Sequence, residues 1–249
     1  MRRAHSTLEK SLQTAESSLR ESEADLRKNR GELRALAARL LATQEEERRR
    51  VSRELHDDLN QKLAMLEVDA ERLGQELNSS PAVVQKVKSL QSRVAEVSND
   101  VRRVAYQLHP SVLDHLGLAV ALRSYCTEFS KREGIRVLLS TDDAPTRIPE
   151  PVALCLYRLT QESLRNVAKH ASAKSASVRL RKANKGIELS IRDNGIGFDT
   201  STPLKGGIGL LSMKERVRLV DGEFALHSKP GKGTQIEVWA PMPEGGSRK

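Results

Sequence analysis

Residues 45–61, EEERRRVSRELHDDLNQ, join two kinds of apolar repeat that decide the fold of the N-terminal half of the chain. Before this stretch, apolar side chains recur at alternating steps of four and three residues, at Leu8, Leu12, Ala15, Leu19, Leu26, Leu33, Leu36 and Leu40. This period is typical of a coiled-coil seam, and polar residues on the seam, here Ser22 and Asn29, fix partner number and register. We therefore expect residues 1–44 to form a coiled coil of two parallel helices.

After the quoted stretch begin two further apolar seams, separated by Ser80-Pro81. Their positions are Leu55, Leu59, Leu63, Leu66 and Leu73, then Val87, Leu90, Val94, Val97, Val101, Val104 and Leu108. Ser80-Pro81 is typical of a helix start, and His109-Pro110 ends the second helix. Because neither helix of this hairpin can bury its stripe alone, residues 45–113 are expected to pair with a second copy in a dimeric four-helix bundle.

The charged run at residues 45–50 interrupts the apolar seam between Leu40 and Leu55. The spacing across it departs from the regular repeat, and such departures change the winding of a coiled coil. The run is therefore a candidate place where a signal alters helix rotation or register. A solvated helix face is the simpler interpretation.

From residue 114 the pattern changes to a mixed α/β domain that extends to residue 243. We expect helices at 118–132, 149–170 and 210–220, and strands at 135–140, 176–181, 187–192, 223–227 and 234–239. The fold class is thus multidomain, α followed by α+β, with helices packed on one face of a mixed sheet. Residues 244–249 are expected to be a disordered tail.

The composition excludes several other classes of protein. Of 249 residues, 3% are aromatic and 30% are charged, which argues against an all-β sandwich. No apolar run is long enough to span a membrane and no signal peptide precedes the coiled coil, so a cytoplasmic protein is expected. Two cysteines, Cys126 and Cys155, indicate neither a disulfide framework nor a zinc site. The net charge of +9 suits phosphate-bearing ligands without separating ATP from nucleic acid.

The first candidate for chemistry is His56, which lies on the flank of the seam and is expected to be exposed on the bundle. A neutral imidazole nitrogen can attack phosphorus, and the adjacent Asp57 could fix its tautomer and accept the ring proton. Asn60 and Gln61 lie one turn onward, where an amide could orient a water molecule. Since the chain has six histidines, an ordinary surface histidine is the alternative.

The second candidate consists of two glycine loops. Residues 193–197, DNGIG, follow a predicted strand, and residues 206–209, GGIG, open a predicted helix. Glycines let the backbone approach a phosphate chain, and a helix N-terminus attracts its charge. The carboxylate of Asp193 is suited to the exocyclic amine of adenine. The stretch 231–234, GKGT, lacks the Walker A order, and each loop alone is more often a tight turn.

The third candidate is one helix face with Glu162 and Asn166, followed by Lys169 and His170 one turn on. A carboxylate and an amide oxygen could hold Mg²⁺ while the lysine meets phosphate. A polar surface face is the alternative, and it is the interpretation that we give to Arg158 and Arg165.

Together these motifs resemble the sensor histidine kinases of two-component systems, in the subgroup that pairs with response regulators carrying a NarL-type helix-turn-helix output. Residues 46–61 are similar to that subgroup's phosphoacceptor box, and residues 108–118 to its interdomain junction. The C-terminal part resembles the Bergerat fold of gyrase and mismatch-repair ATPases. Its N box, two glycine boxes and final loop correspond to residues 162–170, 193–197, 207–210 and 231–234. The resemblance spans residues 45–242.

The resemblance implies a signalling coiled coil, a phosphotransfer hairpin and an ATP-binding catalytic domain. It implies autophosphorylation of His56 with Mg-ATP, with Asp57 as acid/base partner, and transfer to a receiver-domain aspartate. Gln61, or alternatively Asn60, would position water for dephosphorylating the regulator. Asn166 and Glu162 would hold Mg²⁺. The implied ATP-binding residues are Glu162, Asn166, Lys169, His170, Asp193, Gly195, Gly197, Gly207, Gly209, Leu210 and Thr234.

The implied partners are a second copy of the chain and a response regulator, with no nucleic acid and no membrane contact from this segment. The chain is expected in the cytoplasm, alone or as part of a membrane-anchored receptor. A Bergerat ATPase clamp is one alternative, which would share Asn166 and Asp193 but not need His56. A coiled-coil scaffold or nucleic-acid binder is the other, and the scarcity of aromatic residues disfavours it.

Overall fold

A computed structural model describes residues 2–76, 81–108, 110–141, 144–145, 147–200 and 208–242. Within these ranges it does not describe the side chains of residues 2–17, 56, 57, 75, 76, 82, 111, 114, 115 and 208. The predictions made for Ser80, His109, Gly207 and the tail 244–249 therefore lie outside the described residues. The chain divides into two compact units, Met1–Ala42 and Thr43–Lys249.

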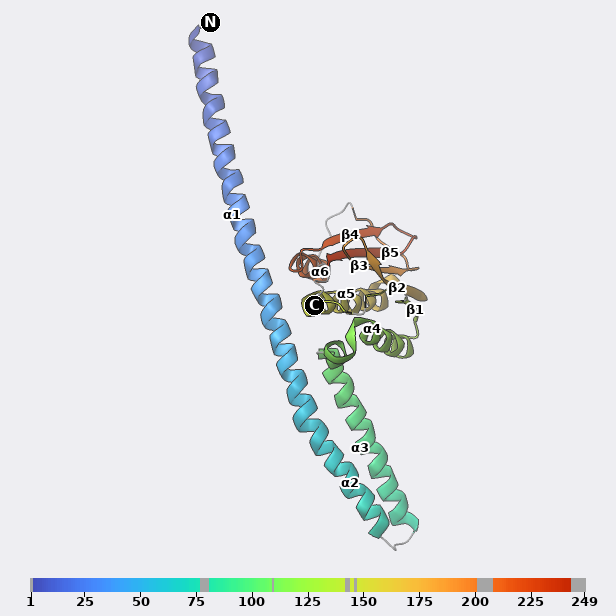
Figure 1. Ribbon diagram of the computed structural model, residues 1–249. Coiled ribbons are helices and arrows are strands. Elements are labelled where there is room, and N and C mark those ends of the chain that lie inside the picture. Colours follow the sequence, from blue (N-terminus) through green and yellow to red (C-terminus); the bar gives the residue numbers. More distant parts are fainter. Residues whose placement is uncertain are drawn as a thin grey trace, which may run out of the picture. The chain divides into compact units, whose positions relative to one another are not determined.

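The first unit is helical throughout its described length and belongs to helix α1 (Arg2–Glu54) (Figure 1). Residues with high helix propensity dominate this sequence. Its seam leucines remain open to solvent, with more than half of the surface exposed at Leu19, Leu26, Leu33, Leu36 and Leu40. The predicted helix is confirmed, and a parallel partner helix stays a prediction.

In the second unit α1 passes into a π-helical turn, η1 (Leu55–Leu59), and then into α2 (Asn60–Glu76). Helix α3 (Pro81–Leu108) returns alongside α2. The Ser52 hydroxyl donates to the Ala105 carbonyl at 2.9 Å, and the Gln91 side-chain amide donates to the Ala70 carbonyl at 3.2 Å. Ala70 on α2 and Ala105 on α3 are small and buried, so α3 can approach the end of α1 and α2 closely. The predicted hairpin is confirmed.

The C-terminal domain begins with α4 (Ser111–Glu133), β1 (Arg136–Ser140) and α5 (Glu150–Asn166), which continues into the π-helical turn η2 (Val167–Ala171). It continues with β2 (Ser175–Ala183), β3 (Gly186–Asp193), α6 (Ile208–Arg218), β4 (Glu223–Ser228) and β5 (Thr234–Pro241). The sheet order is β1-β2-β3-β5-β4, with β1 parallel to β2 and the other neighbours antiparallel.

Helices α4, α5 and α6 lie together on one face of this sheet (Figure 1). The core between the two layers is apolar and fully buried, and it includes Leu122, Leu156, Leu159, Leu164, Leu180, Ile187, Leu189 and Val238. The α+β prediction is confirmed. Helix α4 begins earlier than expected, at Ser111, because Gly117 with φ 80° separates an extra helical segment from the predicted helix. Gly134, with φ 68°, caps the end of α4 at Glu133, one residue beyond the predicted end at residue 132.

Within the described part of the chain, no helix combines the length and apolar character that a membrane span needs.

Candidate active site

A cavity of about 630 Å³ lies in the C-terminal domain among α5, η2, β3, β5 and α6. This volume is in the range of small-molecule sites. Nine of the predicted ATP-binding residues line it: Glu162, Asn166, Lys169, His170, Asp193, Gly197, Gly209, Leu210 and Thr234. Gly195 is not part of the wall. The structure thus brings the predicted motifs, separated by up to 72 residues between Glu162 and Thr234, into one site.

Asp193 is the buried carboxylate of this cavity, with 6% of its surface exposed. It ends β3, and its Oδ1 accepts a hydrogen bond from the Gly195 amide at 2.8 Å. Among the described residues its Oδ2 has no hydrogen-bond partner. Apolar side chains, including Ile191 and Ile236, line the same cavity. A flat heterocycle with an exocyclic amine fits this combination of apolar walls and one free acceptor.

The loop after Asp193 packs tightly against the loop between β4 and β5. A Cβ on Gly197, which has φ 59°, would lie 2.2 Å from the Lys229 carbonyl oxygen. The Ile196 carbonyl accepts from the Gly231 amide at 2.6 Å. Only glycine combines this left-handed backbone with so close an approach. The loop after Asp193, which lines the cavity through Ile196 and Gly197, is therefore packed on the loop between β4 and β5.

The predicted polar helix face also lines the cavity. Glu162 and Asn166 lie on α5, and the Glu162 carboxylate packs directly on α6, since a Cβ on Gly209 would lie 2.3 Å from its Oε1. Arg165, on the same helix, pairs with Glu162. A carboxylate and an amide beside a helix N-terminus are a donor set that fits Mg²⁺ completed by phosphate and water. Lys169 and His170 follow in η2 and are exposed.

The predicted phosphoacceptor His56 and its neighbour Asp57 lie in η1, and their side chains lie outside the described residues. The exposure predicted for His56 therefore stays a prediction. The backbone N–H of Asn60 donates a hydrogen bond to the backbone carbonyl of Leu55, five residues back, and this bond produces the π turn. Such turns often occur at functional sites because they alter the direction of neighbouring side chains.

The two side-chain amides that follow this turn, those of Asn60 and Gln61, differ in their exposure to solvent. Asn60 Oδ1 is buried, and it has no hydrogen-bond partner within the described part of the chain. Gln61 is exposed. Of the two, the side chain of Gln61 is available to a water molecule on the surface of the hairpin.

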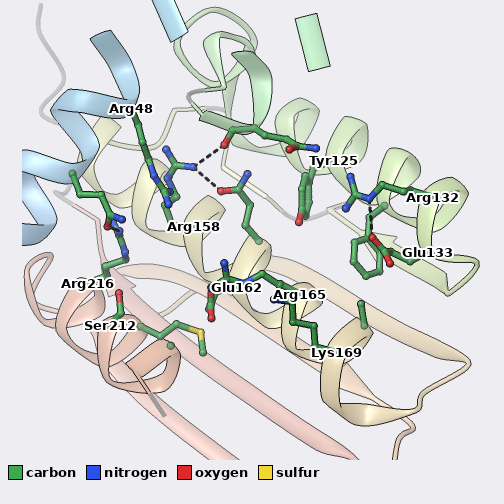
Figure 2. Close-up of a pocket in the computed structure, with 17 residues that line it drawn as sticks. Arg48, Tyr125, Arg132, Glu133, Arg158, Glu162, Arg165, Lys169, Ser212 and Arg216 are labelled. Carbon is green, nitrogen blue, oxygen red and sulfur yellow. Dashed lines mark hydrogen bonds and ion pairs between the residues drawn. The ribbon is translucent and has the colours of Figure 1, made fainter. Parts of the chain in front are cut away.

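The prediction that Arg158 is a surface residue is wrong. Arg158 is 4% exposed and lies in a second cavity, of about 730 Å³, where Figure 2 shows Arg48, Arg158 and Arg216 close together. Its guanidinium donates to the Gln107 carbonyl at 3.2 Å and to the Leu108 carbonyl at 2.5 Å. The position of Arg158 within Leu156-Tyr157-Arg158-Leu159, between apolar residues, is the signal that could have indicated its burial. Arg165 is exposed, as predicted.

The second cavity borders the first, since Glu162, Arg165, Lys169 and Gly209 line both. It carries an excess of positive charge. Burial, followed by the nearby charge of Arg158, lowers the pKa of the Arg48 guanidinium from its ordinary value, while Glu45 acts in the opposite direction.

Comparisons with known proteins agree with this arrangement. Residues 47–113 match the family model described as histidine kinase. Residues 152–244 match the model described as histidine kinase-, DNA gyrase B-, and HSP90-like ATPase.

Among curated proteins, the signal transduction histidine-protein kinase/phosphatase DegS of Brevibacillus brevis is 34% identical over 210 residues, which cover 84% of this chain and 54% of DegS. The oxygen sensor histidine kinase NreB of Staphylococcus carnosus is 34% identical over 203 residues, which cover 81% and 58%. An uncharacterized sensor-like histidine kinase of Chloroflexus aurantiacus is 36% identical over 213 residues, which cover 82% and 36%. The chain therefore spans 36% to 58% of the length of these relatives.

Among solved structures, the histidine kinase domain of the Erythrobacter litoralis EL346 blue-light activated histidine kinase aligns over 73% of this chain and 94% of that one. The sequence identity is 15% and the TM-score 0.47. The family matches cover the hairpin and the ATPase domain in the order that the motifs predicted. The chain belongs to the sensor histidine kinases, in the NarL-type subgroup that its phosphoacceptor box resembles.

Proposed function

We propose that this chain is the kinase portion of a two-component sensor that phosphorylates His56 with Mg-ATP and passes the phosphoryl group to an aspartate of a response regulator. The observation that carries this proposal is the single cavity that unites Asp193, Glu162, Asn166 and the start of α6. It occurs in a chain whose hairpin matches the histidine kinase family. We assign residues 1–44 to the signalling coiled coil, 45–113 to the dimerisation and phosphotransfer hairpin, 114–243 to the ATP-binding catalytic domain and 244–249 to the tail.

ATP is the nucleotide that the match to an ATPase family supports. Asp193 Oδ2 accepts a hydrogen bond from the adenine amine, between the apolar walls of the cavity. Glu162 and Asn166 hold Mg²⁺, which when bound neutralises charge on the triphosphate. Lys169 and the backbone amides at the start of α6 meet the phosphates.

His56 then attacks the γ-phosphorus in line. A nitrogen–phosphorus bond forms, the bond from phosphorus to the β–γ bridging oxygen breaks, and ADP leaves. Asp57 accepts the ring proton. In the reverse part of the signalling cycle, Gln61 orients a water molecule that dephosphorylates the regulator aspartate. The name of the relative DegS, a kinase/phosphatase, supports both activities in one chain.

The partners that we propose are a second copy of the chain and the receiver domain of a regulator with a NarL-type output domain. The proposed place of action is the cytoplasm. An ATPase clamp without histidine phosphotransfer is not favoured, because it leaves the histidine kinase match of residues 47–113 without a purpose.

The test is incubation of the chain with γ-labelled ATP and Mg²⁺, followed by measurement of acid-labile, alkali-stable label on the protein. We expect His56→Ala and Asn166→Ala to lose the label, the first for want of the acceptor and the second for want of bound Mg-ATP. The matched control is His227→Ala, which removes an exposed histidine on β4 that pairs with Glu237. Label that survives in His56→Ala at the unmodified level contradicts the proposal.

A further inference from the structure

Two side-chain oxygens lie buried in the hairpin without a hydrogen-bond partner in the part of the chain that the structure describes. They are Oδ1 of Asn60, the first residue of α2, and the hydroxyl oxygen of Ser98 on α3, a residue that is 1% exposed. A buried polar group without a partner is costly, so such groups ordinarily pair with each other or with a bound water molecule. The reaction proposed above gives neither oxygen a role.

The residues of α3 that face the inside of the hairpin recur at regular steps of three and four. Its described side chains with partial or complete burial are Val84, Val87, Gln91, Val94, Ser98, Val101, Ala105 and Leu108. The opposite side of the hairpin, residues 52–74, follows the same repeat with one exception. Its described side chains with partial or complete burial are Ser52, Leu55, Asn60, Leu63, Glu67, Ala70 and Gly74. The irregular step is the one of five residues from Leu55 to Asn60.

This step of five residues coincides with the π turn η1. The bond from the Asn60 backbone N–H to the Leu55 carbonyl spans the same residues. A continuous α-helix would bring Leu59 inward instead, and would turn Asn60 away from the inside by about 100°. Leu59 is 38% exposed. The π turn thus shifts the inward face of the helix by one residue, and it places an asparagine, not a leucine, inside the hairpin.

Ser98 faces the first turn of α2. Counting inward residues from the bond of Ser52 with Ala105 places Ser98 opposite Asn60. Counting back from the bond of Ala70 with Gln91 places Ser98 opposite Leu63. Two hydrogen bonds through one water molecule span about 5.5 Å, which is one helical turn. A single water molecule can therefore satisfy both buried oxygens.

The phase of the helix matters for His56, the second residue of η1. The direction of a Cα–Cβ bond follows the local winding of the helix, so a π turn and an α turn direct this residue differently relative to α3. In the continuous α-helix, Leu59 would face Ser98, and the serine hydroxyl would be buried beside an apolar side chain. A buried polar residue on a helix seam selects the phase that gives it a partner.

We propose that Asn60 and Ser98 are a polar pair, bridged by one water molecule, that holds the π turn and so makes Asn60 a positioning residue for His56. The inference rests on the proposed function and deepens it by naming the groups that orient the phosphoacceptor. It also gives Asn60 a role different from that of the exposed Gln61 beside it.

The double variant Asn60→Leu/Ser98→Ala tests the pair, because it removes both oxygens and leaves no polar group here to select the phase. Since neither partner is left alone, we expect the midpoint of urea unfolding to equal or exceed that of the unmodified chain. We expect the initial rate of His56 phosphorylation at saturating ATP to fall about tenfold, because a small misplacement of a reacting group has at least this effect. The KM for ATP should not change, since neither residue lines the nucleotide cavity.

Two further variants separate positioning from stability. Asn60→Leu alone leaves the Ser98 hydroxyl buried without its partner, so it should lower both the urea midpoint and the rate. The matched control is Asn99→Leu/Ser92→Ala, which makes the same substitutions at exposed positions of α3 and should leave the rate unchanged. A double variant at positions 60 and 98 that phosphorylates at the rate of this control overturns the inference. So does one whose rate and midpoint fall together, because that result indicates a structural role only.

A second measurement reads His56 without any kinase activity. In chains labelled with ¹⁵N-histidine, the ring signals of His56 are the set that His56→Ala lacks, and they report its tautomer and surroundings. We expect these signals to shift in Asn60→Leu/Ser98→Ala and to stay in place in Asn99→Leu/Ser92→Ala. Unshifted signals in the first variant overturn the inference even if the chain is an active kinase. Shifted signals in a chain that takes no label from ATP support the positioning and contradict only the proposed reaction.

Discussion

At the scale of single residues, two neighbouring amides on one helix have different surroundings. The side-chain oxygen of Asn60, Oδ1, is buried, while the side chain of Gln61 is exposed on the surface of the hairpin. Both are one turn beyond His56, so sequence spacing alone could not choose between them. Burial can choose, because a residue that orients a water molecule for a partner protein must be reachable from solvent.

We expect Gln61→Ala to reduce dephosphorylation of the phosphorylated regulator about 100-fold, the scale of a lost positioning or acid–base group. Autophosphorylation should remain, because Gln61 is not part of the nucleotide cavity. The measurement is the release of phosphate from the labelled regulator in the presence of ADP. A loss of phosphatase activity in Asn60→Ala with none in Gln61→Ala would contradict the assignment.

A second residue-scale prediction concerns the glycines of the nucleotide site. Gly197→Ala places a methyl group 2.2 Å from the Lys229 carbonyl oxygen in a left-handed backbone, and we expect a loss of about 3 kcal/mol of unfolding free energy. Gly231→Ala is the control. Its φ is 75° but nothing lies within 4 Å of the added carbon, so we expect about 1 kcal/mol.

Urea denaturation followed by circular dichroism measures both free energies. ADP titration then shows whether the cavity survives, and we expect affinity to be lost only in Gly197→Ala. Equal destabilisation by the two variants would mean that backbone conformation, and not the contact with Lys229, sets the cost.

At the scale of the elements, each helix of the hairpin keeps an apolar stripe that its own partner helix does not cover. Leu59 of η1 is 38% exposed, and Leu66 and Leu73 of α2 are 53% and 50% exposed, at a spacing of seven residues. Leu90, Val97 and Val104 of α3 repeat this spacing and are 50%, 50% and 46% exposed. A heptad stripe on both helices is the surface that a second hairpin would bury in a four-helix bundle.

We expect Leu66→Glu to weaken dimerisation about 100-fold, because the carboxylate would be buried without a partner in the interface. Arg72→Glu is a matched control on an exposed part of the same helix, off the stripe, and should leave the dimer intact. Light scattering after size-exclusion chromatography measures the mass. ADP affinity should be unchanged in both, because the α+β domain has its own core. A dimeric Leu66→Glu chain would exclude this stripe as the interface.

At the scale of the whole molecule, α1 is shared by both compact units, and the charged run lies just inside the second. A continuous helix transmits rotation, and each residue inserted into it turns the downstream part of the helix by about 100°. The contact of Glu45 with Arg158 and Arg216 is sensitive to such a turn.

We therefore expect periodic kinase activity when residues 2–42 are replaced by a dimeric coiled coil joined at successive one-residue steps. The period should be about 3.6 residues. Glu45→Gln should flatten it, because the ion pairs of Glu45 with Arg158 and Arg216 are then missing at every register. Autophosphorylation rates across seven consecutive registers provide the measurement. A flat profile in the unmodified sequence would exclude rotation of α1 as the input.

The local pattern of the sequence determined much of the secondary structure of this protein and the residue types of its candidate site. The apolar period of 3.5 residues predicted the long helix and the hairpin, because period reports which face of an element is buried. Pro110 located the end of the second hairpin helix through its own backbone preference. Asp193, Gly197, Glu162 and Asn166 are predicted because adenine, phosphate and metal chemistry each restricts the residue types that can serve it, and all four line one cavity.

Tertiary structure alone decided the rest. The polar face of its helix predicts an exposed Arg158, yet this arginine is buried against Glu45, 113 residues away. Asn60 and Gln61 are equivalent in spacing and differ only in burial. Both results depend on which elements pack together, and the free energy of a charge or an amide is set by those neighbours and not by its position in the repeat. The sequence by itself therefore determined the elements and the chemical groups of the site, whereas the packing of distant segments determined which polar groups are buried, paired or available.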